Sequence, residues 1–181
     1  MIAASEDDLH SFEVLVQRHQ NRVYRVALQM LGNEEDAWDV SQEIFIKVYN
    51  ARHSYVKDAK FTTWLYRITN NAVIDKIRYL QRQKLSSLSD AVNEPVSDDP
   101  TTHHHLALEE VKGQMSVVLS KLTERQRGMV ILKYYEGCSV KEIAEVFNCA
   151  TGTVKATLFQ AIQHLRNGLA EVGVFSAEVA S

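Results

Sequence analysis

The chain has 181 residues, 45% of them hydrophobic and 24% charged, which is enough for one or two small domains that each bury a core. Its 20 Lys and Arg residues against 23 Asp and Glu residues give a net charge of −3, which argues against a domain that binds nucleic acid unaided, because such domains are strongly basic. No apolar run is long enough to span a bilayer and the first residues lack a signal-peptide pattern, so we expect a cytoplasmic protein without membrane insertion.

The first part of the chain predicts a bundle of three helices. Apolar residues recur at spacings of three and four over Phe12–Leu31, which is the pattern of one helix face. Gly32 ends this helix, and Asn33 followed by three acidic residues supplies an N-cap and a negatively charged first turn for the next helix. After a polar loop, a third helix is expected to begin near Thr62 or Thr63.

Both prolines, Pro95 and Pro100, lie in a stretch rich in Ser, Asp and Asn that has no helical period, which predicts a flexible linker. The alternation of apolar and polar residues that is typical of strands is absent, so the fold class is all-α, with two small helical domains. The predicted divisions are a first domain over 1–82, a flexible linker over 83–106, a second domain over 107–172 and a tail over 173–181 without a readable signal.

The second domain contains the pattern of a helix-turn-helix motif. Capping boxes begin at Thr123 and at Ser139, and a short amphipathic helix follows the second one. A tight turn over Asn148–Thr151 leads to a last amphipathic helix that buries Val154. The second helix of such a motif enters the major groove of DNA, although helical hairpins are also common in proteins that bind no DNA.

Two other surfaces allow more than one interpretation. On the third helix, Trp64, amides and arginines share a face that suits a single nucleic-acid strand, unless Trp64 only covers the core and the arginines are solvated. On the second helix, Asp36, Asp39 and Glu43 form an acidic stripe that is a solvated face, a docking surface for a basic helix or, in the enzyme alternative, a metal-dependent hydrolase site. No catalytic set, phosphate-binding loop or complete metal site can be defended, so we expect no enzyme activity, cofactor or small-molecule substrate.

Four stretches of the sequence together resemble the extracytoplasmic-function (ECF) branch of bacterial sigma factors. They occur in the family's order and are MLGNEEDAWDVSQEIFIKVY (Met30–Tyr49), FTTWLYRITNNAVIDKIR (Phe61–Arg78), LTERQRGMVILKYYEGCSVKEIA (Leu122–Ala144) and CATGTVKATLFQAIQHLR (Cys149–Arg166). The resemblance implies a non-enzymatic subunit that gives core RNA polymerase its promoter specificity, melts promoter DNA and starts transcription at a particular regulon. It also implies an anti-sigma partner.

The resemblance assigns roles to three sets of residues. Contacts with the polymerase β′ clamp helices are expected from Asp36, Asp39, Gln42, Glu43 and Phe45, and the second domain is expected to meet the β flap. Contacts with the promoter −10 strand are expected from Phe61, Trp64, Arg67, Asn70, Asn71 and Arg78. Contacts with the −35 duplex are expected from Lys141, Thr151, Thr153, Lys155, Ala156, Thr157 and Gln160.

The last helix departs from the family pattern. Family members often carry Arg at the positions of Thr157, Gln160 and Ile162 in this chain. Without these cations, we expect an unusual −35 preference or a heavier reliance on the −10 contact. The competing interpretation is a stand-alone helix-turn-helix regulator, which would bind duplex operators without polymerase.

Overall fold

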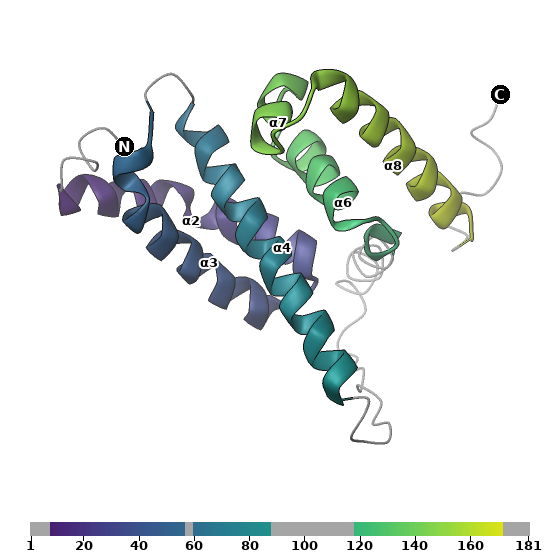
Figure 1. The fold of residues 1–181 in the computed structure, drawn as a ribbon, viewed down its shortest axis with the longest axis horizontal. Coiled ribbons are helices and arrows are strands. Elements are labelled where there is room, and N and C mark those ends of the chain that lie inside the picture. Colours follow the sequence, from purple (N-terminus) through teal and green to yellow (C-terminus); the bar gives the residue numbers. More distant parts are fainter. Residues whose placement is uncertain (1–7, 57–59, 88–117, 172–181) are drawn as a thin grey trace, which may run out of the picture.

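The computed structural model describes residues 8–56, 60–87 and 118–171, and all regular structure within these ranges is helical (Figure 1). Residues 8–56 and 60–87 form an N-terminal domain and residues 118–171 form a C-terminal domain. No helix in the described ranges is long and apolar enough to cross a membrane. The predicted all-α fold with two helical domains is confirmed, whereas most of the predicted linker and the tail lie outside the described residues.

The first two helices begin and end at the residues that the sequence indicates. Helix α2 (Leu9–Leu31) ends at Gly32, whose φ of 73° is a left-handed conformation that favours glycine. Helix α3 (Glu34–Asn50) is capped by Asn33, whose side-chain oxygen accepts a hydrogen bond of 2.9 Å from the backbone N–H of Asp36. These caps satisfy backbone groups that a helix end leaves without intrahelical partners.

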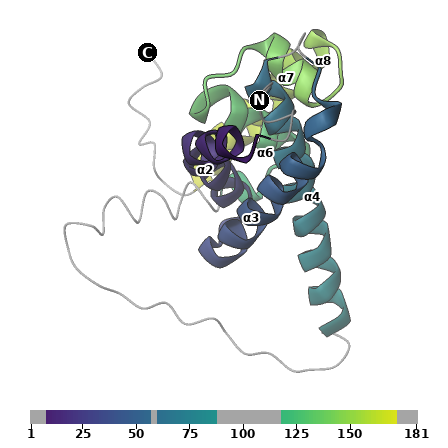
Figure 2. The same ribbon diagram turned by 90° about the vertical axis from the view of Figure 1, so that its left-hand side faces the viewer.

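Helix α4 (Phe61–Ser87) completes the three-helix bundle after a short 3₁₀ turn, η1 (Arg52–Ser54). It begins one residue before the predicted start. It also continues through the first residues of the segment predicted as linker, so that the helical part of the N-terminal domain reaches beyond residue 82. Its C-terminal end projects beyond the other helices (Figure 2). The fully buried side chains between the three helices include Val23, Met30, Ile44, Leu65 and Val73.

The C-terminal domain has the predicted helix-turn-helix arrangement. Its described part starts with one helical turn at 118–120 and continues with α6 (Glu124–Val130), a π-helical turn η2 (Ile131–Tyr135), α7 (Val140–Val146) and α8 (Thr151–Glu171). Both predicted capping boxes are present, one before α6 and one before α7. The π-helical turn, with i to i+5 backbone bonding, has no signal in the sequence pattern.

The two domains pack directly against each other. Helix α4 lies along α7, and α2 contacts both α6 and η2. The close approach depends on Gly128, because a Cβ atom there would lie 2.6 Å from Asn70 Oδ1 of the N-terminal domain. It would also lie 3.0 Å from Cζ of Phe147. A larger residue at position 128 would therefore push the two domains apart or displace side chains on both sides.

Candidate nucleic-acid interface

Helix α8 presents most of its predicted contact residues to solvent. Its inner face buries Val154, Leu158 and Ala161 against the C-terminal domain. The residues predicted to contact duplex DNA are exposed, apart from Thr157, which is half-buried; the exposed ones are Thr151, Thr153, Lys155, Ala156 and Gln160 on α8 and Lys141 on α7. The geometry therefore leaves one side of α8 free to enter a major groove.

Phe159 is an exposed aromatic residue that the predicted contact set omits. Its side chain is 67% exposed on α8, in the turn that carries Gln160. An apolar side chain on a recognition helix can contact the thymine methyl group in the major groove. The signal was available in the sequence, because Phe159 follows Ala156 at a spacing of three, on the outer side of the helix.

Aromatic rings cluster at the start of α4. The ring centroid of Trp64 lies 5.5 Å from that of Tyr55 and 5.9 Å from that of Phe61, and the His19 ring lies 5.2 Å from Phe61. Trp64 is half-buried, so it covers part of the core and also presents ring surface to solvent. Trp64 thus covers part of the core, and its contact with a DNA strand stays a prediction.

The polar residues predicted on the outer face of α4 have different surroundings. Asn71 is exposed. Arg67 donates a hydrogen bond of 2.6 Å to the backbone carbonyl of Glu145, and Arg78 Nε lies 3.4 Å from a carboxylate oxygen of Glu124. Asn70 is only 5% exposed, and its Oδ1 has no hydrogen-bond partner. The C-terminal domain thus covers part of the surface that the sequence predicts to bind a DNA strand.

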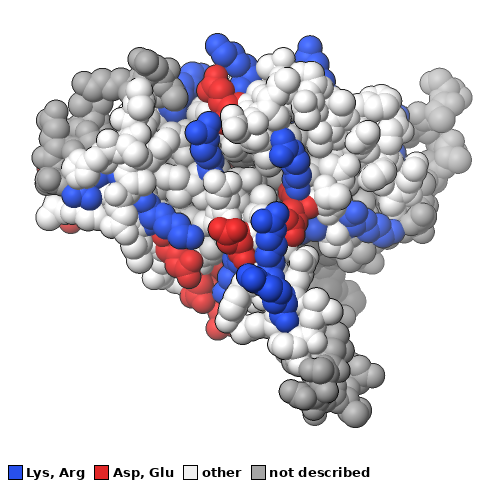
Figure 3. All heavy atoms as spheres, in the orientation of Figure 1, with Lys and Arg blue, Asp and Glu red and all other residues white. Residues whose placement is uncertain are grey.

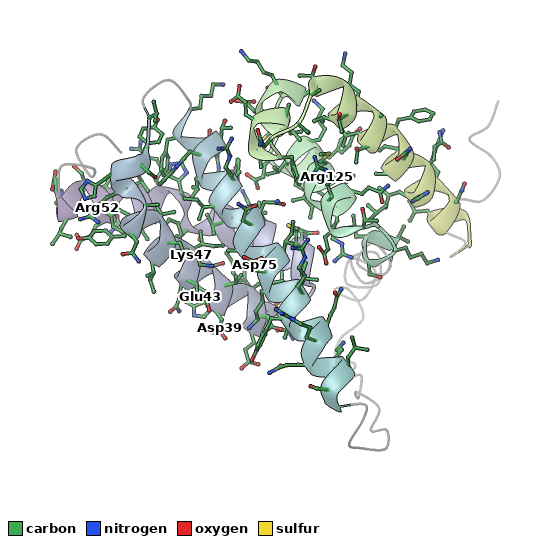
Figure 4. All side chains as sticks on the ribbon, in the orientation of Figure 1. Asp39, Glu43, Lys47, Arg52, Asp75 and Arg125 are labelled. Carbon is green, nitrogen blue, oxygen red and sulfur yellow. The ribbon has the colours of Figure 1, made fainter. Side chains whose placement is uncertain are left out.

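The acidic residues of α3 form a surface on the N-terminal domain (Figure 3). Asp39 and Glu43 are exposed and follow one another along the helix, ahead of Lys47 (Figure 4). Asp36 is different, because its carboxylate lies 2.9 Å from Nζ of Lys76 on α4. The hydrogen bond to Asp36 raises the pKa of Lys76 above its ordinary value. Asp36 therefore joins α3 to α4 and offers less charge to a partner than Asp39 or Glu43.

An apolar groove of about 580 Å³ lies beside this acidic surface, between α2 and α3. Trp38, which is 58% exposed and absent from the predicted contact set, contacts Tyr24 edge-on at 6.1 Å. Two predicted contact residues line the groove: Gln42 is exposed, whereas Phe45 is 9% exposed and belongs to the core. The combination of an apolar groove and nearby carboxylates fits an amphipathic helix with basic residues.

The acidic surface does not form a metal centre. Within the described parts of the chain, no three His, Cys, Asp or Glu side chains are grouped so that they could hold a metal ion. The histidines at 103–105 lie outside the described residues. The structure therefore gives no support to the metal-dependent hydrolase alternative.

Comparisons with known proteins identify both domains. Residues 15–83 match the family model described as sigma-70 region 2, and residues 112–165 match the one described as sigma-70, region 4. The sigma factor SigW of Bacillus subtilis is 30% identical over 91% of this chain and 92% of its own length. The sigma factor SigE of Mycolicibacterium smegmatis is 32% identical over 89% of this chain, which spans 62% of that relative. The chain belongs to the ECF sigma factors.

Solved structures share the fold of this ECF sigma factor. The structure of CnrH in complex with the cytosolic domain of CnrY has a TM-score of 0.71 at 23% identity and covers 97% of this chain and 96% of its own. The sigma factor RpoE of Bartonella quintana, in complex with the anti-sigma factor NepR, has a TM-score of 0.69 at 22% identity, with 88% and 97% of the two chains covered. We now call the N-terminal domain region 2 and the C-terminal domain region 4. A stand-alone helix-turn-helix regulator is not favoured, because region 2 matches a sigma factor domain as well.

Proposed function

We propose that this ECF sigma factor directs core RNA polymerase to a specific set of promoters, with region 2 opening the −10 element and region 4 reading the −35 duplex. The observation that carries the proposal is the combination, in one chain, of an exposed recognition helix and a helix α4 that presents aromatic and cationic groups. The protein acts as a non-catalytic subunit, without a cofactor, in the cytoplasm where the polymerase works.

The polymerase contact is proposed for α3 and the adjoining groove. Asp39, Gln42 and Glu43 are exposed and would face the basic side chains of the β′ clamp helices. Trp38 would supply an apolar anchor, since exposed aromatic residues beside a pocket contribute strongly to binding. Asp36 would act mainly by holding α3 against α4 through Lys76. Region 4 would bind the β flap.

The −10 contact is proposed for the N-terminal half of α4. Bases stack on aromatic faces while cations follow the phosphates of a single strand. The half-exposed ring of Trp64 and the aromatic cluster around Phe61 suit the first role. Arg67 and Arg78 suit the second, and the amides of Asn70 and Asn71 can hydrogen-bond base edges.

The −35 contact is proposed for the exposed face of α8. Ala156 and Phe159 can contact thymine methyl groups, and Gln160 can pair with an adenine edge. Among the described residues of the predicted −35 contact set, the cations are Lys155 on this face and Lys141 on α7, and both are exposed. The small number of cations predicts a weak salt dependence of the −35 contact, because each neutralised phosphate adds about 0.9 to the slope of log affinity against log salt.

An anti-sigma factor is proposed as a further partner. The solved structures with the same fold include CnrH bound to the cytosolic domain of CnrY and RpoE bound to NepR. The groove between α2 and α3 is one surface of this chain that fits an amphipathic helix from such a partner, in competition with the polymerase.

The test of the polymerase contact is a binding titration of labelled sigma factor with core polymerase. Asp39→Ala combined with Glu43→Ala should weaken binding about 10-fold or more, because both charges face the partner. The matched control is Asp75→Ala, an exposed acid on α4 that should leave the affinity within two-fold. Equal affinities for the double variant and the wild-type chain would contradict the assignment of α3.

A further inference from the structure

Four cations of region 2 are engaged by oxygen atoms of region 4. The contacts are Lys60 Nζ to Glu142 at 2.8 Å, Arg67 to the Glu145 carbonyl at 2.6 Å, Arg78 to Glu124 at 3.4 Å and Arg25 to Glu136 at 3.7 Å. Three of these four cations belong to α4 or to the residue just before it. Region 4 thus meets the cationic side of α4 with carboxylate and carbonyl oxygens.

The buried carboxylate of Glu136 fixes the position of region 4 against region 2. The side chain of Glu136 is only 4% exposed, and it accepts a hydrogen bond of 2.6 Å from the hydroxyl of Tyr66 on α4. Burial and this bond raise the pKa of Tyr66 above its ordinary value, so the hydroxyl stays a donor. A buried charge is costly unless it is paired and hydrogen-bonded, so Glu136 favours the arrangement in which Tyr66 and Arg25 face it.

We propose that, in the free sigma factor, region 4 docks on the face of α4 for which the −10 contact is proposed. It occupies this face in place of DNA until a −10 strand or the polymerase displaces it. The proposal rests on the proposed role of α4 in strand binding. The carboxylates of Glu124 and Glu142 and the carbonyl of Glu145 take the place of strand phosphates.

Region 4 and a DNA strand cannot bind this face of α4 at the same time, for a chemical and a steric reason. Carboxylate, carbonyl and phosphate oxygens all accept from the same guanidinium and ammonium groups, and a donor held by one is lost to the others. Asn70 is 5% exposed beneath Gly128, so a base cannot reach it while region 4 is docked. A negatively charged chain whose promoter-binding cations are already paired has little affinity for free DNA.

The first experiment tests whether region 4 is docked on α4 in solution. It uses carbodiimide coupling, which joins a lysine amine to a carboxylate in contact with it. Full-length protein without DNA should give a Lys60–Glu142 cross-link, identified by mass spectrometry, because these groups lie 2.8 Å apart. A saturating random-sequence 15-nucleotide single strand should suppress the cross-link. Absence of the cross-link, or a cross-link that the strand leaves unchanged, would overturn the proposal.

The second experiment compares two variants on the same helix with the same change of charge. Glu142→Gln removes the ion pair with Lys60 but keeps a side chain that completes the capping box. Glu145→Gln is the control, because Arg67 bonds its backbone carbonyl. The single strand should bind Glu142→Gln about two- to five-fold more tightly than the control, the range of one partly exposed ion pair. Equal affinities would count against the proposal. Transcription by the holoenzyme tests the proposed −10 contact of α4 separately. In the holoenzyme the polymerase positions both regions, so the result does not depend on whether region 4 docks on α4 in the free protein.

Discussion

Arg127 links the two regions through backbone carbonyls, and its replacement gives the sharpest stability test. Its guanidinium donates to the carbonyls of Leu119 at 2.9 Å, Ser120 at 3.1 Å and Leu122 at 3.4 Å, and to that of Met30 at 2.7 Å. The first three are carbonyls around the end of the helical turn before α6, and the last is near the end of α2. Of these carbonyls, that of Leu119 also accepts a backbone hydrogen bond of 3.1 Å from Leu122 N–H. Carbonyls at a helix end lack the partners that a continuing helix would supply, so one side chain bonds to oxygen atoms at the ends of two helical segments.

The expected cost of Arg127→Met follows from these four bonds. A hydrogen bond to a charged group contributes about 1.5–3 kcal/mol, but four bonds to one guanidinium do not add, and the bond to Ser120 is open to water. Methionine keeps most of the packing of the alkyl stem. We therefore expect the free energy of unfolding of region 4 to fall by about 3–5 kcal/mol.

Native-state hydrogen exchange can measure this loss for region 4 alone, because it reports the opening free energy of each helix. The matched control is Arg125→Met on the same helix, which removes a cation 5.5 Å from the Phe147 ring centroid and should cost about 0.5–1 kcal/mol. A loss in Arg127→Met no larger than that of the control would refute the role given to the carbonyl contacts.

Three further outcomes are expected. Ile44→Ala should lower the free energy of unfolding of region 2 in urea by about 2–5 kcal/mol, because the side chain is fully buried, and a loss below that range would argue against a tightly packed bundle. Hydrogen bonds with Lys60 and then Ser139 lower the pKa of Glu142 from 4.5 to about 2, so their stabilisation is complete above pH 4.5 and is lost as the pH falls towards 2. Glu142→Gln should therefore make the free energy of unfolding depend less on pH between pH 4.5 and about 2. An unchanged pH dependence would contradict the role given to these hydrogen bonds. The double substitution Thr157→Arg with Gln160→Arg should make holoenzyme binding to the −35 duplex more sensitive to salt. The slope of log affinity against log salt concentration should steepen by about 2, and no change would mean that neither position faces a phosphate.

The helices and their caps were predictable because their signals are local. Asn33 and Ser139 act as N-caps through hydrogen bonds that span three residues, and Gly32 ends α2 by its own backbone conformation. Apolar spacing then gave the three-helix bundle and the helix-turn-helix arrangement. These interactions depend on neighbours within one turn, so no knowledge of the tertiary fold was needed.

The docking of the regions was not predictable in the same way. Asn70 and Gly128 meet across two domains, and neither residue carries a local signal for the other. The pairing of Asp36 with Lys76 likewise arises only when α3 and α4 pack together. Sequence periodicity assigned Asn70 to an outer face, but it cannot say which outer face a second domain will cover.

Reconstitution with core RNA polymerase tests the central claim most directly. The measurement is run-off transcription from a library of genomic promoter fragments, followed by mapping of the RNA 5′ ends. The account predicts new start sites that appear only when the full-length sigma factor is added and that share paired −10 and −35 sequences. Transcripts that are the same with and without the protein, or duplex binding that needs no polymerase, would contradict it.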